Sequence, residues 1–382
     1  MKFAHLGDCH LGGWRQPELK ELNFECFKEA MDRILKEKVD FILLAGDLFD
    51  SPYPPIETLK ETFEVFKKIK EASIPVFLIA GSHDYSVSGK TFLDVLEKAG
   101  FCRNVSLYEE REERIILQPT IFHNIAIYGY PGKKSGMEVD EIERIKLQDS
   151  PGLFKILMLH TTLRDAIGDI PMKAVDEKKL PKVDYLALAH LHINYNRDGR
   201  VYCGPIFPNN ISELEELRAG SFYIFDNGKI RKEIIKFKEI LSVHLEITNA
   251  LSATEDILSL LKTKEVRDKI VILRLSGGLE KGKISDIDFV KVESFLKENK
   301  SYVFLKSTTK LHMKEQEIEA GLLDSENLEE QIIKKFEESN PNKFNYLISS
   351  LIHVLQVQKL EDEKQSTFED RLLSEARTLL EI

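Results

Sequence analysis

The first 235 or so residues alternate near-continuous apolar runs with amphipathic segments, and this alternation most constrains the fold. The segments 23–38 and 56–72 carry apolar residues at helical spacing. Strands that are apolar almost throughout are typical of a sheet covered on both faces. The sequence therefore predicts a layered α/β domain. Its expected strands lie at 2–7, 40–46, 74–81, 124–130, 154–160 and 184–190.

Acidic or histidine side chains stand at the ends of five of these strands. In an open α/β sheet, ligands bind outside the carboxyl ends of the strands, so these side chains are expected to converge on one site. Five of the ten histidines belong to the set. The set consists of Asp8 and His10, Asp47, His83 and Asp84, His160, and His190 with His192.

The chemistry that needs such a set is a hydrolytic site with two metal ions. Two divalent cations about 3.5–4 Å apart need a shared carboxylate, together with imidazole and oxygen ligands that leave positions open for water and a phosphoryl oxygen. Asp47, in a Gly-Asp turn after a strand, suits the shared position. One ion would take Asp8, His10 and His192, and the other His160 and His190.

Single histidines at strand ends are usually structural, and His5 and His123 are interpreted in that way. The ordered combination of all five motifs is much more specific than any one of them.

Composition limits the function classes. A chain of 382 residues predicts two or three domains, and 42% hydrophobic with 31% charged residues is typical of a soluble globular protein. Without an apolar run of membrane-spanning length or a signal-type apolar core, we expect a cytoplasmic protein. The four scattered cysteines fit reduced thiols. A net charge of −10 argues against a large basic field for polyanions, although a local basic groove can coexist with it.

The rest of the chain changes character twice. Residues 242–314 read as a small separate α/β module, and the part after Gly321 as charged helices with apolar stripes. Such stripes need a partner surface, but packing on the chain's own core or on one another fits the pattern as well. The stripes are Leu328, Ile332 and Phe336, then Phe344, Leu347, Ile348, Leu351 and Leu355, and finally Phe368, Leu372, Ala376 and Leu379.

The motifs DCH, GDLFD, GSHD, LMLH and AHLH, in this order, resemble the calcineurin-like metallophosphoesterase superfamily over the first 230 residues. DCHLG, together with CGPIFPNNISELEELRAGSFYI after the last motif, resembles one branch, the DNA double-strand break repair nucleases of the SbcD and Mre-eleven kind in their archaeal form. This resemblance implies a four-layer sandwich of two packed sheets flanked by helices over residues 1–240. It also implies a small α/β DNA-capping domain at 241–318 and a helical tail at 319–382.

The same resemblance implies partners and an activity. The tail would dock on an SMC-like coiled-coil ATPase, and the helices 56–72 and 91–98 would form a homodimer, although Leu59, Phe63 and Phe66 could equally be ordinary core. The expected activity is 3′–5′ exonuclease action on duplex DNA ends and endonuclease action on single strands. The protein would then be cytoplasmic and associated with the nucleoid.

The resemblance further implies roles for single residues. Asp8, His10, Asp47 and His192 would bind the first ion, and Asp47, His160 and His190 the second. His83 would be the acid that protonates the departing alkoxide, oriented by Asp84. A water activated by the ions would attack phosphorus in line. Manganese is the usual metal of the family, while imidazole and carboxylate ligands alone also tolerate iron, cobalt or zinc.

Two positions depart from the family pattern. Ser82 stands where the family has an asparagine whose amide oxygen binds the second ion. Our hypothesis is that water or the Ser82 hydroxyl fills this place and that the second ion binds more weakly. Asp50 stands where some members have a histidine that positions DNA, which leaves the balance of exonuclease and endonuclease action open.

Two other functions stay open at this point: a scaffold that organises the ATPase and DNA ends without catalysis, and a small-molecule phosphodiesterase. Loop residues near the strand ends could contact DNA phosphates, although exposed lysines in loops are usually only solvated. These residues are Trp14, Arg15, Lys90, Lys133 and Lys134.

Overall fold

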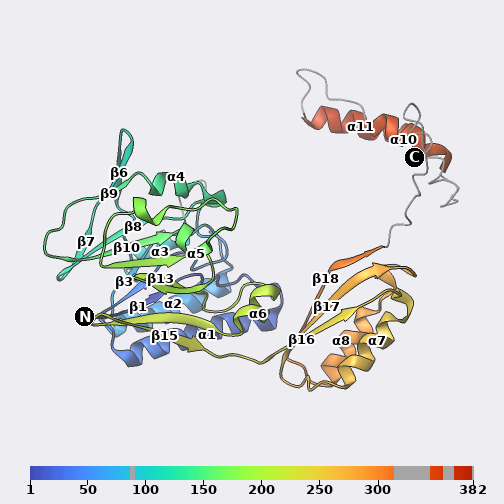
Figure 1. Ribbon diagram of the computed structural model, residues 1–382, viewed down its shortest axis with the longest axis horizontal. Coiled ribbons are helices and arrows are strands. Elements are labelled where there is room, and N and C mark those ends of the chain that lie inside the picture. Colours follow the sequence, from blue (N-terminus) through green and yellow to red (C-terminus); the bar gives the residue numbers. More distant parts are fainter. Residues whose placement is uncertain (87–90, 314–344, 356–364, 381–382) are drawn as a thin grey trace. The chain divides into compact units, whose positions relative to one another are not determined.

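The structure is a computed structural model that describes residues 1–86, 91–313, 345–355 and 365–380. It divides into two compact units, Met1–His312 and Met313–Ile382. The first unit contains two six-stranded sheets, a three-stranded sheet beside them, and a smaller domain (Figure 1).

The first large sheet has the strand order β15-β14-β1-β2-β3-β4. Strands β1 to β4 run parallel, and β14 and β15 pair antiparallel at one edge. The expected strands at 2–7, 40–46 and 74–81 are present but shorter. The bounds are β1 Lys2–Leu6, β2 Phe41–Leu44, β3 Val76–Leu78, β4 Arg103–Asn104, β14 Gly220–Asp226 and β15 Lys229–Ile235.

The second large sheet has the strand order β12-β13-β11-β10-β8-β7. Its four inner strands are parallel, and both edge strands are antiparallel. The bounds are β7 Thr120–Phe122, β8 Ile125–Tyr130, β10 Phe154–His160, β11 Tyr185–Ala189, β12 Asn194–Arg197 and β13 Arg200–Cys203.

The two sheets pack face to face, and strand β1 shows why its sequence is apolar throughout. Phe3 lies in the core between the sheets, stacked on Phe41 and against Tyr185 of the second sheet. Ala4 and Leu6 point to the opposite face, into the core under the helices. Because successive side chains of a strand point to opposite faces, both sets must be apolar in a sheet covered on both sides.

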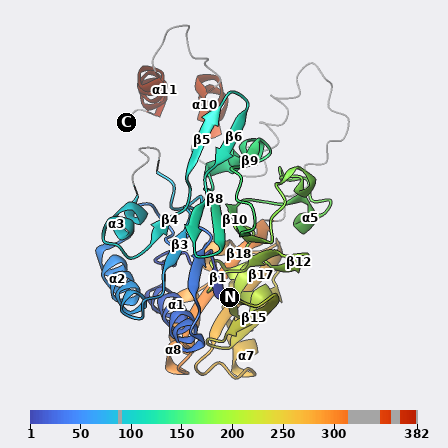
Figure 2. The same ribbon diagram turned by 90° about the vertical axis from the view of Figure 1, so that its left-hand side faces the viewer.

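Helices cover the outer face of the first sheet. They are α1 Pro17–Glu37, α2 Ile56–Glu71 and α3 Phe92–Lys98. Helix α1 begins at Pro17, earlier than the sequence pattern predicted, because proline is favoured in the first turn, where its missing N–H is no loss. Figure 2 shows α2 and α3 on the left and α5 on the right, with strands of both sheets between them.

The outer face of the second sheet carries the short helices α4 Glu138–Ile142 and α5 Arg164–Ile167 together with a third sheet. This third sheet has the order β5-β6-β9, with bounds Tyr108–Arg111, Arg114–Leu117 and Ile145–Leu147. Ile115 of β6 and Val139 of α4 pack on Tyr128 of β8. The predicted four-layer arrangement is confirmed, but its second flank is partly β-sheet rather than helices alone.

The smaller domain of the first unit is a three-stranded sheet, β16-β17-β18, with two helices on one face. Its bounds are β16 Ile240–Glu246, α7 Ala250–Lys262, β17 Ile270–Leu279, α8 Phe289–Glu298 and β18 Val303–Met313. Helix α6, Ile211–Leu217, precedes β14 and contacts β16. Ile270, Ile272 and Val303 join the core beneath α1, so the small domain also packs on the larger one.

The second unit contains helices α10 Ile348–Leu355 and α11 Gln365–Leu380, which contact each other. Phe368, Leu372, Ala376 and Leu379 of the predicted last stripe are half-buried, while Leu373 is exposed. The predicted stripe Leu328 to Phe336 and the start of the next at Phe344 lie outside the described residues. Among the helices that the structure describes, none is long and apolar enough to cross a membrane.

Candidate metal centre

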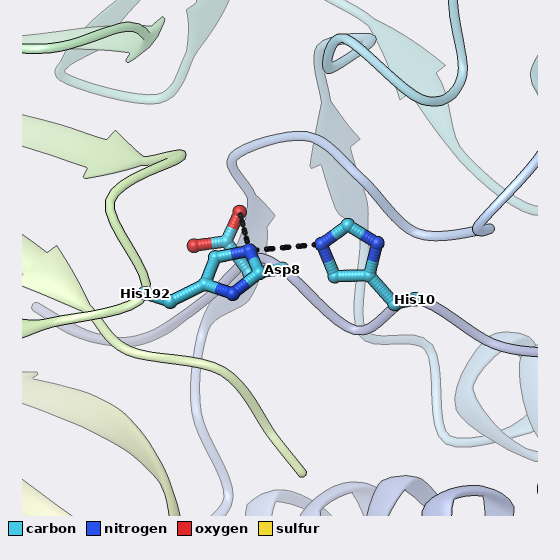
Figure 3. Close-up of side chains that lie close together, drawn as sticks. All are labelled: Asp8, His10 and His192. Atoms are coloured by element: carbon cyan, nitrogen blue, oxygen red, sulfur yellow. Dashed lines mark hydrogen bonds and ion pairs between the residues drawn. The ribbon is translucent and has the colours of Figure 1, made fainter. Parts of the chain in front are cut away.

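The side chains at the strand ends of both large sheets meet at one place. Asp8 and His10 follow β1, Asp47 follows β2, His160 ends β10, and His192 follows β11. Three groups have ligand atoms within 4.8 Å of one another: Asp8 with His10 and His192, Asp8 with Asp47 and His160, and His10 with Asp50 and His83. Figure 3 shows His192 reaching from one sheet toward Asp8 and His10 of the other.

Three of the histidines are held in the same way. The Nδ1 atom lies 3.2 Å from Asp50 Oδ1 in His10, 3.0 Å from Glu213 Oε1 in His192, and 3.0 Å from the Ala45 carbonyl oxygen in His160. A hydrogen bond of Nδ1–H to an oxygen leaves the lone pair of Nε2 free, which is the usual arrangement of a metal-binding histidine.

The Nε2 atoms of His10 and His192 lie close to each other, and those of His10 and His160 face Asp47. His10 Nε2 and His192 Nε2 are 3.0 Å apart, and Asp47 Oδ2 lies 3.7 Å from His10 Nε2 and 3.1 Å from His160 Nε2. One buried carboxylate oxygen of Asp47 therefore faces histidines of both expected ligand sets. The donor set fits two cations that share this carboxylate.

Asp8 links the two sheets at this place. Its carboxylate accepts the His190 backbone N–H at 2.9 and 3.0 Å, and Oδ1 lies 3.9 Å from His192 Nε2. The His190 ring stacks edge-on against His160 with centroids 5.0 Å apart. Within the described part of the chain, His190 belongs to none of the ligand groups, so its binding of the second ion stays a prediction.

The backbone around the centre is held in an uncommon conformation. Positive φ angles of 45–104° occur at Asp8, His10, Asp47, His190 and His192. Residues other than glycine rarely adopt this region, and each such residue costs on the order of 1–3 kcal/mol. Strain concentrated in five candidate ligands indicates that the surrounding fold forces these side chains into place.

Two motif glycines make room for the ligands. A Cβ atom at Gly81 would lie 2.2 Å from Asp47 Oδ1, and one at Gly46 would lie 2.5 Å from His160 Nδ1. Gly46 also has a φ of 100°. The Gly-Asp and Gly-Ser-His-Asp motifs therefore both need glycine for space, and the Gly-Asp motif also needs it for backbone freedom.

The charges at the centre shift the pKa of its members in opposite directions. Burial lowers the pKa of His160, but the nearby carboxylates of Asp47 and Asp8 outweigh it and raise this pKa to about 10. Burial raises the pKa of Asp47, and the charges of His160 and His10 reverse the effect and hold it well below its usual range. Without a cation, protonated histidines balance the carboxylates.

The pKa values of His192 and His190 also shift in opposite directions. The pKa of His192 is lowered by burial but raised more strongly by Asp8 and Glu213, to about 9. Burial and the charge of His160 lower the pKa of His190 to about 4. A divalent cation would take over the role of the protons on His160 and His192, because metal binding displaces protons from its ligands.

His83 lies at the exposed side of the centre. Its ring is 45% exposed, and Nδ1 lies 3.0 Å from the Asp50 carbonyl oxygen and 3.4 Å from Asp50 Oδ1. Its backbone N–H donates to Asp47 Oδ1 at 2.7 Å. The neighbouring Ser82 hydroxyl donates to Asp47 Oδ2 over 3.4 Å.

The expected orientation of His83 by Asp84 is wrong. Both Asp84 oxygens accept backbone N–H groups, from Leu48, Phe49 and Gly81, at 3.1–3.2 Å. Burial and the charge of Asp47 raise the pKa of Asp84 to about 6. Asp84 therefore stabilises the loop after β2. Its carboxylate accepts hydrogen bonds from backbone N–H groups, and none of these bonds comes from the ring of His83.

Asp50 and Glu213 are the functional residues that sequence reasoning missed. The sequence pattern relates Asp50 only to DNA positioning, yet in the structure it holds His10 and lies beside His83. Glu213 stands three residues after Asn210, whose side chain accepts the Glu213 backbone N–H at 3.0 Å. This capping pattern was legible in the sequence, but it gave no sign that the same carboxylate reaches His192.

The remaining predictions have mixed outcomes. Trp14 is buried and its Nε1 donates to the Pro208 carbonyl oxygen at 2.9 Å, so its indole N–H is already used within the fold. Lys133 pairs with Glu141 at 2.7 Å, Arg15 and Lys134 are exposed, and Lys90 lies outside the described residues. His5 is buried between the sheets with Nδ1 3.0 Å from the Tyr185 hydroxyl, away from the centre, and His123 sits in a turn between β7 and β8.

Comparison with known proteins gives a family. The chain is 28% identical to the DNA double-strand break repair protein Mre11 of Methanococcus maripaludis over 63% of this chain and 68% of that protein. It is 26% identical to the protein of the same name from Archaeoglobus fulgidus over 65% and 59%. It is also 28% identical to the uncharacterized metallophosphoesterase YhaO of Bacillus subtilis over 69% of each. The matches thus span about three fifths to two thirds of these relatives.

Residues 1–194, about half of the chain, match the family described as calcineurin-like phosphoesterase. This stretch contains both sheets up to β11 and all predicted ligands from Asp8 to His192. The chain belongs to the calcineurin-like phosphoesterase family and is a metal-dependent phosphoesterase.

Proposed function

We propose that the protein is a DNA nuclease with two metal ions that processes DNA double-strand breaks. The observation that carries this proposal is the convergence of three histidine Nε2 atoms on two carboxylates, those of His10 and His160 on Asp47 and that of His192 on Asp8, each histidine being held through Nδ1. DNA as the substrate is supported by the archaeal relatives, which are DNA double-strand break repair proteins by name. The proposed actions are exonuclease cleavage of duplex ends and endonuclease cleavage of single strands.

The first ion is assigned to Asp8, His10, Asp47 and His192, and the second to Asp47, His160 and His190. Manganese is the proposed metal at both positions. When bound, the ions polarise a phosphoryl oxygen and lower the pKa of water to near neutrality. Ser82 offers a hydroxyl beside Asp47, and we propose that it or a water completes the second ligand set.

The chain's own acid is His83. Its Nδ1 faces Asp50, which leaves Nε2 of the protonated ring to donate to the departing alkoxide oxygen. Its exposed ring is accessible to a bound substrate. Asp50 holds His83 and His10 together, so the acid and a metal ligand keep a fixed separation. Asp84 serves this arrangement by bracing the loop that carries Asp47.

The parts of the chain outside the metal centre are assigned to binding of DNA and of protein partners. We propose residues 241–318 as a domain that caps bound DNA and 319–382 as a docking tail for an SMC-like coiled-coil ATPase. The half-buried stripe of α11 supports a helical docking element. A homodimer through α2 and α3 is supported by Ile56 and Val95, which are exposed apolar side chains on these helices. The expected place of action is the cytoplasm, at the nucleoid.

The decisive experiment is cleavage of end-labelled duplex DNA by the purified full chain with Mn²⁺, with chelator as the blank. Asp47→Asn and His83→Ala are the test variants. We expect the wild type to cut and both variants to lose at least 100-fold in rate, with thermal melting used to show that they are folded.

Each contrary result points to another function. Hydrolysis of bis-nitrophenyl phosphate without cleavage of duplex or single-stranded DNA would indicate a small-molecule phosphodiesterase. No hydrolysis of either substrate, even with the ATPase partner and ATP, would indicate a scaffold.

A further inference from the structure

Helix α6 stands between the metal centre and the small domain, and its two sides contact different partners. Glu213 and Glu215 are two residues apart, which places them about 200° apart around the helix axis. Glu213 reaches the centre, whereas Glu215 reaches the small domain. Leu214 between them is fully buried and fixes the helix in the core. Figure 1 shows α6 on the side of the larger domain nearest to β16.

The side of α6 near the centre holds two candidate ligands. Glu213 Oε1 lies 3.0 Å from His192 Nδ1, and Glu213 Oε2 accepts the Asn209 backbone N–H at 2.8 Å. The Asn209 side chain in turn donates to Asp50 Oδ1 over 3.5 Å, and this same oxygen lies 3.2 Å from His10 Nδ1. The start of α6 thus supports His10 and His192, both assigned to the first ion.

The other side of α6 is tied to strand β17 by a forked arginine contact. Arg274 Nε donates to Glu215 Oε2 at 2.5 Å, and Arg274 Nη2 donates to the Ser212 hydroxyl at 3.0 Å. His244 of β16 lies 3.5 Å from Glu215 Oε1. The side chains of Arg274 and Glu215 are only 23% and 17% exposed, so solvent screens this pair less than an ordinary surface ion pair.

We propose that Arg274 is a positioning residue through which the small domain sets the geometry of the first metal ion. The path runs from Arg274 to Glu215, along α6 to Glu213, and then to His192. The second ion shares Asp47 with the first, but its histidines, His160 and His190, take part in none of the contacts described for α6, so it is outside this path. Rotation of the small domain, or binding of a partner to it, would then change the affinity of the first ion and leave that of the second unchanged. This inference rests on the two-metal centre of the proposed function.

The experiment measures Mn²⁺ binding by calorimetry on the full chain at fixed pH, in the wild type and in Arg274→Gln, Glu215→Gln and the double variant. Glu213→Gln is the positive control, because loss of a hydrogen-bond partner of a ligand typically weakens metal binding about 10- to 100-fold. Arg231→Gln is the matched negative control, since Arg231 of β15 pairs with Glu37 of α1 at 3.0 Å and not with a residue of α6. Thermal melting of the metal-free proteins shows whether each variant is folded.

We expect Arg274→Gln and Glu215→Gln each to weaken one Mn²⁺ site about three- to tenfold. This loss of affinity is smaller than the one expected for Glu213→Gln. The double variant should lose no more than the stronger single variant, because both changes break one contact. Arg231→Gln should stay within twofold of the wild type.

Unchanged binding in both single variants would overturn the inference while the two-metal centre stands. Equal weakening of both sites, with a lower melting temperature, would also overturn it, because that pattern reports general loosening of the fold. A wild type that binds no Mn²⁺ would instead overturn the proposed function, and this inference with it.

Discussion

At the scale of single residues, Asp50 lies between a metal ligand and the proposed acid. Its Oδ1 lies 3.2 Å from His10 Nδ1 and 3.4 Å from His83 Nδ1. The carboxylate can orient the ring of His83 and at the same time fix the tautomer of His10. Because Asp50 contacts both histidines, a loss of activity in an Asp50 variant can arise through either one. A useful test must therefore separate the effect on His83 from the effect on His10.

In Asp50→Asn, substrates with different leaving groups separate the effect on His83 from the effect on His10. Poor alkoxide leaving groups, as in DNA, need a proton from His83, whereas nitrophenolate does not. General acid catalysis contributes about 10²- to 10⁴-fold, so we expect DNA cleavage to fall about 10- to 100-fold and bis-nitrophenyl phosphate hydrolysis to fall less than threefold at saturating Mn²⁺. Equal losses on both substrates would show that Asp50 acts through His10 and the metal instead.

Ser82 gives a second prediction at this scale. Its hydroxyl lies 3.4 Å from Asp47 Oδ2, and a serine reaches less far than an asparagine amide oxygen. We expect Ser82→Asn to lower the Mn²⁺ concentration for half-maximal activity several-fold, with Ser82→Ala as the control that removes the hydroxyl without adding a ligand. The idea fails if the metal titration of Ser82→Asn overlays that of the wild type.

At the scale of elements, His5 joins the two sheets from strand β1. Its ring is fully buried beside Tyr185 of β11, and its Nε2 lacks a hydrogen-bond partner in the described part of the chain. Burial lowers its pKa from 6.5 to about 3. Between these two values the unfolded chain binds a proton that the folded protein does not, so this residue reduces the stability of the fold as the pH falls below 6.5.

Replacing His5 with leucine should remove that dependence. Each pH unit between about 6 and 4 costs the wild type about 1.4 kcal/mol through this group, on top of the shared contributions of the metal centre. We expect a flatter loss of unfolding free energy with falling pH in His5→Leu, measured by urea denaturation of the metal-free proteins. Parallel curves for the two proteins would show that His5 is not buried in its neutral form.

The same elements show what sequence reasoning can predict and where it stops. Apolar runs and the residues that end them predicted β1, β2, β3, β8, β10 and β11 and the meeting of Asp8, His10, Asp47, His160 and His192, because strand direction alone brings strand ends together. The other strands of the large domain were not predicted: β4, β5, β6, β7, β9 and β12 to β15. Of these, β5, β6 and β9 are short and partly charged. The contacts of Asp50, Asp84 and Glu213 depend on side-chain direction across chain separations that no local pattern encodes.

At the scale of the whole molecule, the centre joins the two halves of the sandwich. Asp8, His10 and Asp47 belong to loops of the first sheet, whereas His160 and His192 belong to the second. A cation bound by both sets therefore stabilises the packing of one sheet on the other. Binding to the folded state alone adds about 2.7 kcal/mol at a metal concentration 100 times the dissociation constant.

The sign of the pH dependence follows from the same charges. The pKa values of His160 and His192 are about 10 and 9 without a cation, so both rings must lose a proton before Nε2 can bind metal. We expect the Mn²⁺ affinity to rise from pH 6 to pH 8, by about tenfold per pH unit for each proton released. The stabilisation by Mn²⁺ should grow in parallel, and thermal melting at several metal concentrations measures both quantities.

Asp47→Asn is the variant that tests this link between metal, charge and fold. It removes the carboxylate that raises the pKa of His160, and with it the shared ligand of both ions. We expect the metal-free variant to stay folded and its melting temperature to show little response to Mn²⁺ at any pH from 6 to 8. A variant that Mn²⁺ stabilises as strongly as the wild type would mean that the cation binds elsewhere and that the strand-end residues hold only protons.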